Sequence, residues 1–198
     1  INMIDGLDGL AGGVSILALF HLVLAMHLID RPMSTADLTL IIALCGALTA
    51  FLLFNLTQGH GKIFLGDAGA MMLGLFLAYF LIKASQTQPL TSTLPTSLVA
   101  WIVALPVFET LTLMVRRILA GGSPFAPDRI HLHHLLLDCG YSKYGSLIIA
   151  LVLSLALTWT GYALSSLGGT IAGAAFLGSI AIYYLAISAL QRLSQSGG

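Results

Sequence analysis

Six long runs of apolar residues, separated by short polar stretches, dominate the chain. Each run is about 20 residues long, which is the length that an α-helix needs to cross a hydrocarbon core of about 30 Å. None of the runs alternates apolar and polar positions as the strand of a barrel does, so helices are expected. The pattern predicts an all-α bundle of about six membrane spans, which run approximately over residues 10–29, 38–56, 68–83, 96–115, 144–164 and 169–190.

The composition supports a membrane setting. Hydrophobic residues make up 58% of the chain and charged residues only 8%, and the mean hydropathy is +0.97. A soluble protein carries roughly 25% charged residues, so this chain has too little charge to cover a surface that faces water. The net charge is zero, and no electrostatic argument therefore favours nucleic acid as a partner.

Glycines recur inside the predicted spans. Lipid offers no hydrophobic driving force for helix association, so helices in a membrane associate through close packing. Small residues permit this close approach. We therefore expect close helix–helix contacts at residues Gly12, Gly13, Gly46, Gly69, Gly74, Gly161, Gly173 and Gly178.

The charges predict which side of the membrane each connection faces. Six spans place the N-terminal stretch, the connections 55–67 and 116–143 and the C-terminal tail on one side, with six of the eight Lys and Arg residues. The positive-inside rule makes this side cytoplasmic. The polar residues suited to chemistry converge on it, which predicts one cytoplasmic active site; they are Asp5, Asp8, Asp67, Asp128, His131, His133 and His134.

The first polar cluster is the stretch NMIDGLDGLAGG at residues 2–13. Asp5 and Asp8 are three positions apart, so on a helix they would share a face. Two carboxylates at the mouth of a span can hold Mg²⁺ together with phosphate oxygens and water, or bond a base or ribose. The simpler interpretation is a helix N-cap with an acidic first turn. Two aspartates with interleaved glycines favour the functional interpretation.

The second cluster is KIFLGDAGA at residues 62–70. Asp67 stands at the start of a predicted span, between Gly66 and Gly69, which let a phosphate approach the backbone. A capped helix start is again the simpler alternative. An ionisable residue at the membrane boundary is nevertheless a functional hypothesis by default.

The third cluster, SPFAPDRIHLHH at residues 123–134, holds three histidines within four positions. An anion site is the favoured interpretation. Zinc is the competing one, but His133 and His134 are adjacent and point in different directions on a helix, with no suitably spaced partner nearby. Carboxylates for a hard cation, with His and Arg for a pyrophosphate, are the equipment of phosphoryl-type transfer, in which positioning and charge neutralisation supply most of the catalysis.

Three strings of the chain resemble the motifs of a known family. NMIDGLDGLAGG, KIFLGDAGAMMLG and SPFAPDRIHLHHLLLDCG are similar, in order, to those of the polyprenyl-phosphate N-acetylhexosamine-1-phosphate transferases. Within this family they most resemble the bacterial undecaprenyl-phosphate N-acetylglucosamine-1-phosphate transferases. The resemblance implies that UDP-GlcNAc and undecaprenyl phosphate react, with Mg²⁺ or Mn²⁺, to give undecaprenyl-pyrophosphoryl-GlcNAc and UMP. It also implies the bacterial inner membrane and the synthesis of lipid-linked cell-envelope glycans such as lipopolysaccharide.

The resemblance further implies a role for each motif residue. Asp67 would be the metal ligand, Phe64 would stack on the uracil, and Asp8 is the candidate for contacting the base. The His and Arg residues of the third motif would hold the pyrophosphate and sugar. The residues expected to be catalytic are Asp5, Asp8, Asp67 and His131. Those expected to bind substrate are Asn2, Phe64, Arg129, His133 and His134.

The chain departs from the family pattern at three places. The paired-aspartate motif expected upstream of Asn2 is not in this chain. We therefore interpret residues 1–198 as the C-terminal part of a single transmembrane catalytic domain, without its N-terminal spans, and expect it to be inactive alone. Ala70 stands where Ser is usual, and Glu109 stands where Asp is frequent.

Other functions stay open at this point. A transporter or channel subunit would use the aspartates as an ion path, which predicts ionisable residues near the bilayer midplane and an inverted repeat. A non-catalytic membrane subunit could keep the family fold. Within the enzyme class, the donor could carry GalNAc or a MurNAc-pentapeptide in place of GlcNAc. The sequence also leaves open a homodimer.

Overall fold

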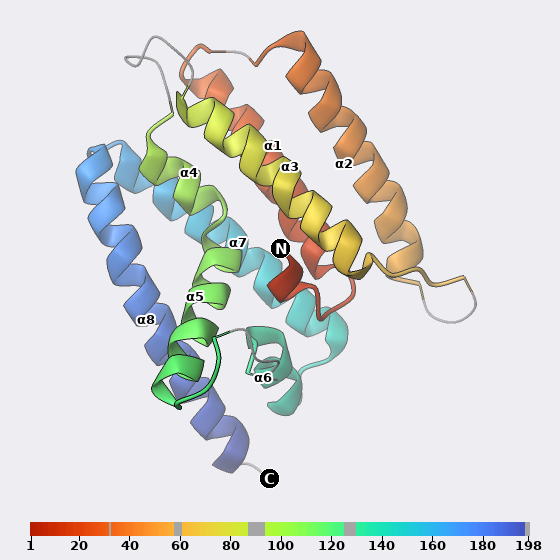
Figure 1. The fold of residues 1–198 in the computed structure, drawn as a ribbon, viewed down its shortest axis with the longest axis vertical. Coiled ribbons are helices and arrows are strands. Elements are labelled where there is room, and N and C mark those ends of the chain that lie inside the picture. Colours follow the sequence, from red (N-terminus) through yellow and green to blue (C-terminus); the bar gives the residue numbers. More distant parts are fainter. Residues whose placement is uncertain (32, 58–60, 87–93, 125–129, 197–198) are drawn as a thin grey trace.

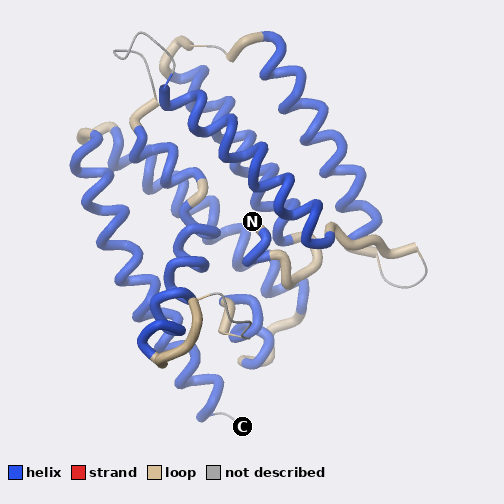
Figure 2. The backbone as a smooth tube through the Cα atoms, in the orientation of Figure 1, coloured by secondary structure: helices blue, strands red, loops and turns tan. Residues whose placement is uncertain are grey.

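The computed structural model describes the chain except for residues 32, 58–60, 87–93, 125–129 and 197–198 (Figure 1). Within the described residues every regular element is a helix, which confirms the all-α prediction (Figure 2). Five of these helices are long and apolar enough to cross a membrane, and a bent pair supplies a sixth crossing if it counts as one span. The five are α1 (Leu10–Leu28), α2 (Thr35–Asn55), α3 (Gly66–Gln86), α7 (Lys143–Ser165) and α8 (Gly169–Ser196).

The fourth predicted span is not one continuous helix. It consists of α4 (Thr96–Ile102) and α5 (Ala104–Leu119), whose directions differ by 81°. Pro106, the third residue of α5, explains the break. It has no N–H to donate, and its ring would clash with the carbonyl four residues earlier, at Ile102, whereas the first turn of a new helix tolerates it. The span predicted over 96–115 therefore corresponds to a bent pair of helices and not to one continuous helix.

Helix α1 is the central element of the bundle. It packs against α2, α3, α4 and α7, and most of its side chains are buried. Helix α2 lies at the edge of the bundle, and most of its apolar side chains are exposed (Figure 1). Apolar surface of this kind suits lipid rather than water. Two short helices complete the described elements: the 3₁₀ helix η1 (Asn2–Ile4) and α6 (Leu132–Asp138).

Aromatic side chains hold the two halves of the bent pair against α8. Phe108 of α5 lies 6.2 Å from Trp101 of α4, 5.0 Å from Phe176 and 5.8 Å from Tyr183, measured between ring centroids. The Trp101 indole N–H also donates to the carbonyl of Ala172 at 3.0 Å. Because each contact spans two helices, the direction of α5 after the bend is determined by packing as well as by Pro106.

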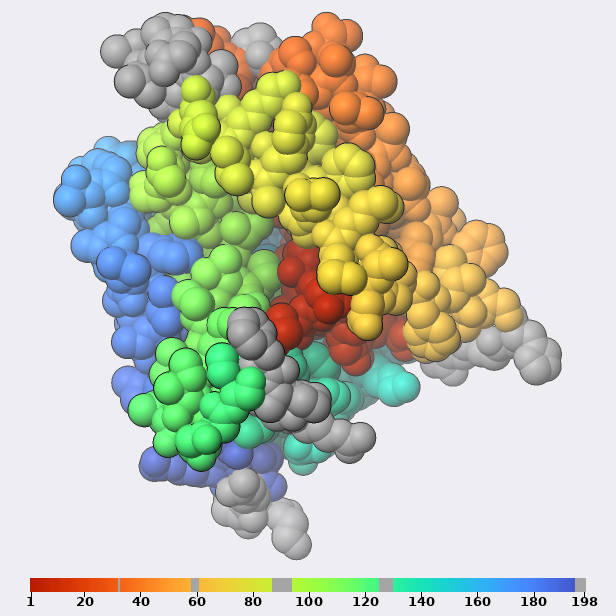
Figure 3. Space-filling model, viewed as in Figure 1, coloured from red at the N-terminus to blue at the C-terminus, as the bar shows by residue number. Residues whose placement is uncertain are grey.

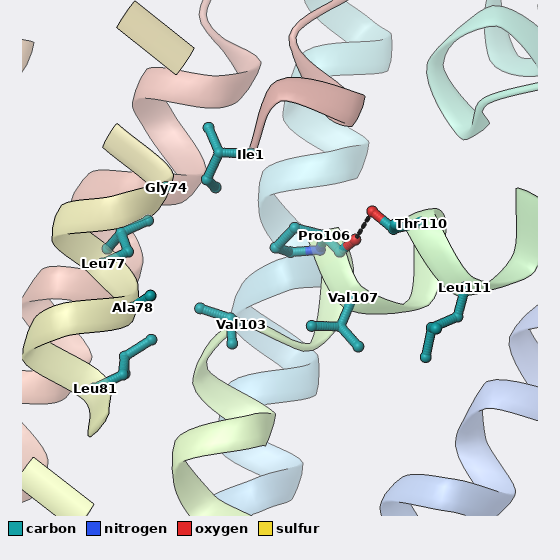
Figure 4. Close-up of a pocket in the computed structure, with 10 residues that line it drawn as sticks. All are labelled: Ile1, Gly74, Leu77, Ala78, Leu81, Val103, Pro106, Val107, Thr110 and Leu111. Atoms are coloured by element: carbon teal, nitrogen blue, oxygen red, sulfur yellow. Dashed lines mark hydrogen bonds between the residues drawn. The ribbon is translucent and has the colours of Figure 1, made fainter. Parts of the chain in front are cut away.

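The bend also leaves a recess of about 370 Å³ between α3 and α5 (Figure 4). Its lining is apolar and includes Leu77 and Leu81 of α3, Val107 of α5 and the N-terminal residue Ile1. The space-filling view shows the N-terminal residues at the bottom of a hollow between these two helices (Figure 3).

The predicted packing role of the glycines holds for only some of them. A Cβ atom added at Gly12 or Gly13 would lie within 3.0 Å of a leucine side chain of a neighbouring helix. At Gly161 it would lie 2.2 Å from Cβ of Trp101, so α7 and α4 approach most closely there. The prediction was wrong for Gly46 and Gly173, and also for Gly178, where no atom lies within 4 Å of the added Cβ.

Replacing Gly161 by Ala tests the contact between α4 and α7. We expect Gly161→Ala to lower the free energy of unfolding by about 1–3 kcal/mol, because the added methyl group overpacks against Trp101. Gly173→Ala is the matched control, since its methyl group meets open space and should cause no loss. Thermal unfolding of both variants in detergent micelles measures the difference. Equal midpoints for the two variants would contradict the close approach.

Candidate active site

The first two motifs meet at one pocket of about 230 Å³. Asp5 and Asp8 come from the turn between η1 and α1, and Asp67 comes from the first turn of α3. Phe64, in the connection before α3, lines the same pocket and is 72% exposed. Four of the predicted site residues, from segments about 60 positions apart, therefore share one cavity.

Asp5 and Asp8 do not lie on a helix, so the spacing that would place them on one helix face does not apply. Both lie in the turn that precedes α1, and α1 has no acidic residue in its first turn. Its N-cap is Gly9, which adopts a left-handed conformation (φ 82°) and provides no side-chain cap. The simpler capping interpretation is therefore also wrong, and the two carboxylates are available to the pocket.

A buried amide that the sequence analysis overlooked holds this turn in place. The side chain of Asn55, at the end of α2, accepts a hydrogen bond from the N–H of Gly9 at 2.7 Å and donates to the carbonyl of Ile63 at 2.9 Å. Asn55 thus connects the first motif to the second. A polar residue at the end of an apolar run was the only signal for it in the sequence, and such a residue is more often a simple helix terminus.

The carboxylates of the pocket repel one another. Burial raises the pKa of Asp5, and the negative charges of Asp67 and Asp8 raise this pKa further. Asp8 is partly neutralised by Lys62, whose ammonium group lies 2.6 Å from its Oδ2 and 5.0 Å from the centroid of the Phe64 ring. Lys62 is a second residue to which the sequence analysis gave no role.

The donor set fits a divalent cation with open coordination positions. Among the described residues, no three His, Cys, Asp or Glu side chains are placed to enclose a metal ion by themselves. Mg²⁺ is usually held by one or two carboxylates, with phosphate oxygens and water as the other ligands. A pocket lined by three aspartates, whose mutual repulsion a cation would relieve, meets that description.

The three histidines lie around the start of α6 and contact one another. His131 is the N-cap of α6, and its ring centroid lies 5.4 Å from that of His133. The rings of His133 and His134 are 4.2 Å apart. Arg129 lies outside the described residues. Asn2, in η1, is exposed and does not line the pocket.

His133 connects the third motif to the first. It is only 2% exposed, and a Cβ added at Gly6 would lie 2.5 Å from its Nε2. Burial, followed by the charges of His134 and His131, lowers the pKa of His133 to about 3. His133 is therefore neutral near pH 7 and packs against the turn that carries Asp5 and Asp8.

Comparisons with known proteins show which sequences this chain is similar to. Residues 1–85 match the sequence model described as Glycosyl transferase family 4. The undecaprenyl-phosphate alpha-N-acetylglucosaminyl 1-phosphate transferase of Yersinia pestis is 31% identical over 163 residues, which cover 81% of this chain and 43% of the relative. The protein of the same name from Escherichia coli (strain K12) is 33% identical over 152 residues, covering 75% of this chain and 40% of the relative. These matches confirm the resemblance to the undecaprenyl-phosphate N-acetylglucosamine-1-phosphate transferases.

A mycobacterial relative covers more of the chain. The decaprenyl-phosphate N-acetylglucosaminephosphotransferase of Mycobacterium leprae is 33% identical over 202 residues, which cover 92% of this chain and 49% of the relative. The chain thus spans less than half the length of the curated relatives that it matches. No solved structure matches.

A double-mutant cycle tests the contact between Gly6 and His133. We expect Gly6→Ala to lower the free energy of unfolding by about 1–3 kcal/mol, because the new methyl group collides with the imidazole. In the His133→Ala background the same methyl group enters the space that the ring vacated, so the double variant should be more stable than the sum of the single effects. Thermal unfolding in detergent measures all four proteins. Additive effects would contradict the contact, and Gly46→Ala is the unhindered control.

Proposed function

We propose that this protein is a glycosyl-1-phosphate transferase. It moves GlcNAc-1-phosphate from UDP-GlcNAc to undecaprenyl phosphate and releases UMP, in the synthesis of lipid-linked cell-envelope glycans. The observation that carries the proposal is the convergence of the three motifs. Gly6 lines the aspartate pocket and also contacts His133, so the histidine segment adjoins the pocket wall. Two relatives whose printed names state a transfer to undecaprenyl phosphate support the same activity.

The pocket offers a place for the nucleotide. Phe64 presents an exposed ring on which uracil stacks in this proposal, and Asp8 contacts the base. Lys62 keeps the Asp8 carboxylate beside that ring through their ion pair. The side of the pocket formed by Asp5 and Asp67 then faces the diphosphate.

The proposed metal ligand is Asp67. The family is metal-dependent in general, and Mg²⁺ is the ion proposed here because its ligands are carboxylates. When bound, the ion would neutralise charge on the pyrophosphate oxygens. Asp5 lies close enough to Asp67 for the negative charge of Asp67 to raise the pKa of Asp5, so the two carboxylates interact electrostatically.

The reaction needs little covalent chemistry from the protein. An oxygen of undecaprenyl phosphate attacks the phosphorus that carries the sugar, a new P–O bond forms, and the bond to the bridging oxygen breaks so that UMP leaves. A phosphate monoester is largely ionised at pH 7, so the attacking oxygen needs no strong base. Positioning and charge neutralisation are then the main tasks. In this proposal His131 and His134, with Arg129 of the same motif, neutralise the diphosphate.

The acceptor and the membrane setting fit the fold. The long apolar helices and the membrane enzymes among its relatives indicate a multi-pass membrane protein. The bacterial inner membrane, with the active site facing the cytoplasm, is the proposed setting. The apolar recess in Figure 4 includes Ile1, four residues from Asp5, and offers a polyprenyl chain an apolar surface beside the polar pocket.

Replacing Asp67 tests the reaction and the metal together. Membranes that contain the product of the whole gene should release UMP from UDP-GlcNAc when undecaprenyl phosphate and Mg²⁺ are supplied. Asp67→Asn should lower this rate at least about 100-fold, because it removes the carboxylate proposed to hold the cation that neutralises the pyrophosphate. Asp30→Asn is the matched control, since Asp30 lies in the connection after α1 at a positive φ that Asn tolerates. A folded wild type that releases no UMP from any UDP-sugar would favour a transporter or a non-catalytic subunit.

Replacing Phe64 tests the place of the uracil. Phe64→Leu should raise KM for UDP-GlcNAc about tenfold with a smaller change in kcat, because stacking of a base on an aromatic ring contributes about 1–3 kcal/mol. Phe64→Tyr keeps the ring and should behave as the wild type. The measurement is UMP release over a range of donor concentrations. An unchanged KM in Phe64→Leu would place the base elsewhere, and competition by other UDP-sugars would identify the preferred donor.

A further inference from the structure

Glu109 is a buried carboxylate to which neither the resemblance nor the proposed reaction gives a role. It lies on α5, three residues after Pro106, and is only 4% exposed. Its oxygens accept hydrogen bonds from the hydroxyl group of Tyr183 on α8, from Nδ1 of His131 at 3.1 Å and from the backbone N–H of Leu132 at 3.2 Å. One side chain thus connects α5, α8 and the start of α6.

We propose that Glu109 is a positioning residue of the transferase site, which holds His131 in one tautomer and one orientation beside the aspartate pocket. The inference rests on the proposed function, because it assigns Glu109 a part in that reaction. Glu109 itself touches no substrate in this proposal and acts through His131.

Glu109 caps the start of α6. His131 is the N-cap of this helix, and its own side chain makes no capping hydrogen bond. The carboxylate of Glu109 accepts the N–H of Leu132 instead, so a side chain of α5 caps α6 from outside. Because the same carboxylate also bonds the imidazole of His131, one group holds both this ring and the backbone N–H of the next residue, Leu132.

Glu109 also determines which nitrogen of the His131 imidazole carries the proton. Nδ1 of His131 is engaged with Glu109, which makes Nδ1 the protonated nitrogen and leaves Nε2 as the ring nitrogen for a ligand. The other titratable groups near this bond are Tyr183, which donates to Glu109, the neutral His133, which stacks on His131, and His134. Among these groups Glu109 is the one that accepts from Nδ1 of His131.

The burial of the Glu109 carboxylate has an energetic cost that helix packing does not require. Removing a carboxylate from water costs several kcal/mol, and its hydrogen bonds at best offset this cost, so an apolar side chain of similar volume would hold the helices equally well. The neighbouring Phe108 already packs α5 against α8 through Phe176 and Tyr183. Helix packing therefore does not require a charge at position 109, whereas the orientation of His131 does.

The test is the pH dependence of kcat/KM for UMP release by the product of the whole gene, in membranes. Glu109→Gln removes the negative charge that stands 3.1 Å from Nδ1 of His131, and an amide oxygen is a weaker partner for this nitrogen than a carboxylate. We therefore expect Glu109→Gln to reduce kcat/KM about tenfold or more, as loss of a group that orients a catalytic imidazole usually does. We also expect its alkaline limb to move about one pH unit lower. Glu109→Asp keeps the charge and should keep the limb near its wild-type position.

Two further variants separate positioning from stability. Tyr183→Phe removes a donor to Glu109 but leaves the carboxylate charged, so the limb should not move to lower pH. Thr112→Val alters another buried polar residue of α5, whose hydroxyl group has no hydrogen-bond partner among the described residues, and should leave both rate and limb unchanged. A Glu109→Gln enzyme that is less active but keeps the wild-type limb would overturn the inference and make Glu109 purely structural. If Glu109→Gln does not fold, an alkaline limb that moves to lower pH in Glu109→Asp or in Tyr183→Phe, both of which keep the carboxylate, overturns the inference equally.

A failure of the proposed function is distinguished from a failure of this inference by the activity of the wild type. A wild type that releases no UMP refutes the proposed reaction, whatever the variants do. The coupling between His131 and Glu109 is then decided by NMR titration of the histidines in detergent micelles. A His131 pKa that is lower in Glu109→Gln than in the wild type supports the positioning role, and an unchanged pKa overturns it.

Discussion

The break between α4 and α5 is the constraint on which the rest of the site depends. Pro106 prevents a helix from continuing through Ile102, and the aromatic contacts of Phe108 then direct α5 along α8. Only this direction brings Glu109 to the start of α6. A straight span would have carried the same carboxylate along its axis, where lipid could not satisfy it. Because of the bend, the buried carboxylate of Glu109 has hydrogen-bond donors that offset the cost of its burial.

A second set of contacts determines the shape of the aspartate turn. Asn55 binds the backbone of Gly9 on one side, and His133 packs against Gly6 on the other. Both partners come from distant parts of the chain, and both leave the carboxylates of Asp5 and Asp8 facing the pocket. The turn is thus held by uncharged groups, while the charge of Asp8 is paired with Lys62. An acidic wall therefore stands beside a histidine segment.

The neutral His133 and the carboxylate-bound His131 show how two similar side chains acquire different properties. Burial keeps His133 uncharged, so it serves as a spacer between the two motifs. His131 is also buried, but its Nδ1 is bonded to the carboxylate of Glu109. Two histidines of one motif, two positions apart, thus have different surroundings, because each ring meets a different neighbour.

The sequence by itself determined the all-helical fold, the approximate limits of the spans, the three motifs and the family, because hydrophobic length and motif spacing are local properties. It also predicted four residues that share the pocket. The tertiary structure alone decided the break at Val103, the non-helical turn of Asp5 and Asp8, the ion pair of Lys62 and the engagement of Glu109. Each of these features depends on a partner tens of residues away or on the place where a proline interrupts a helix. The hydrophobic pattern of a single segment predicts neither the distant partner nor the position of the break.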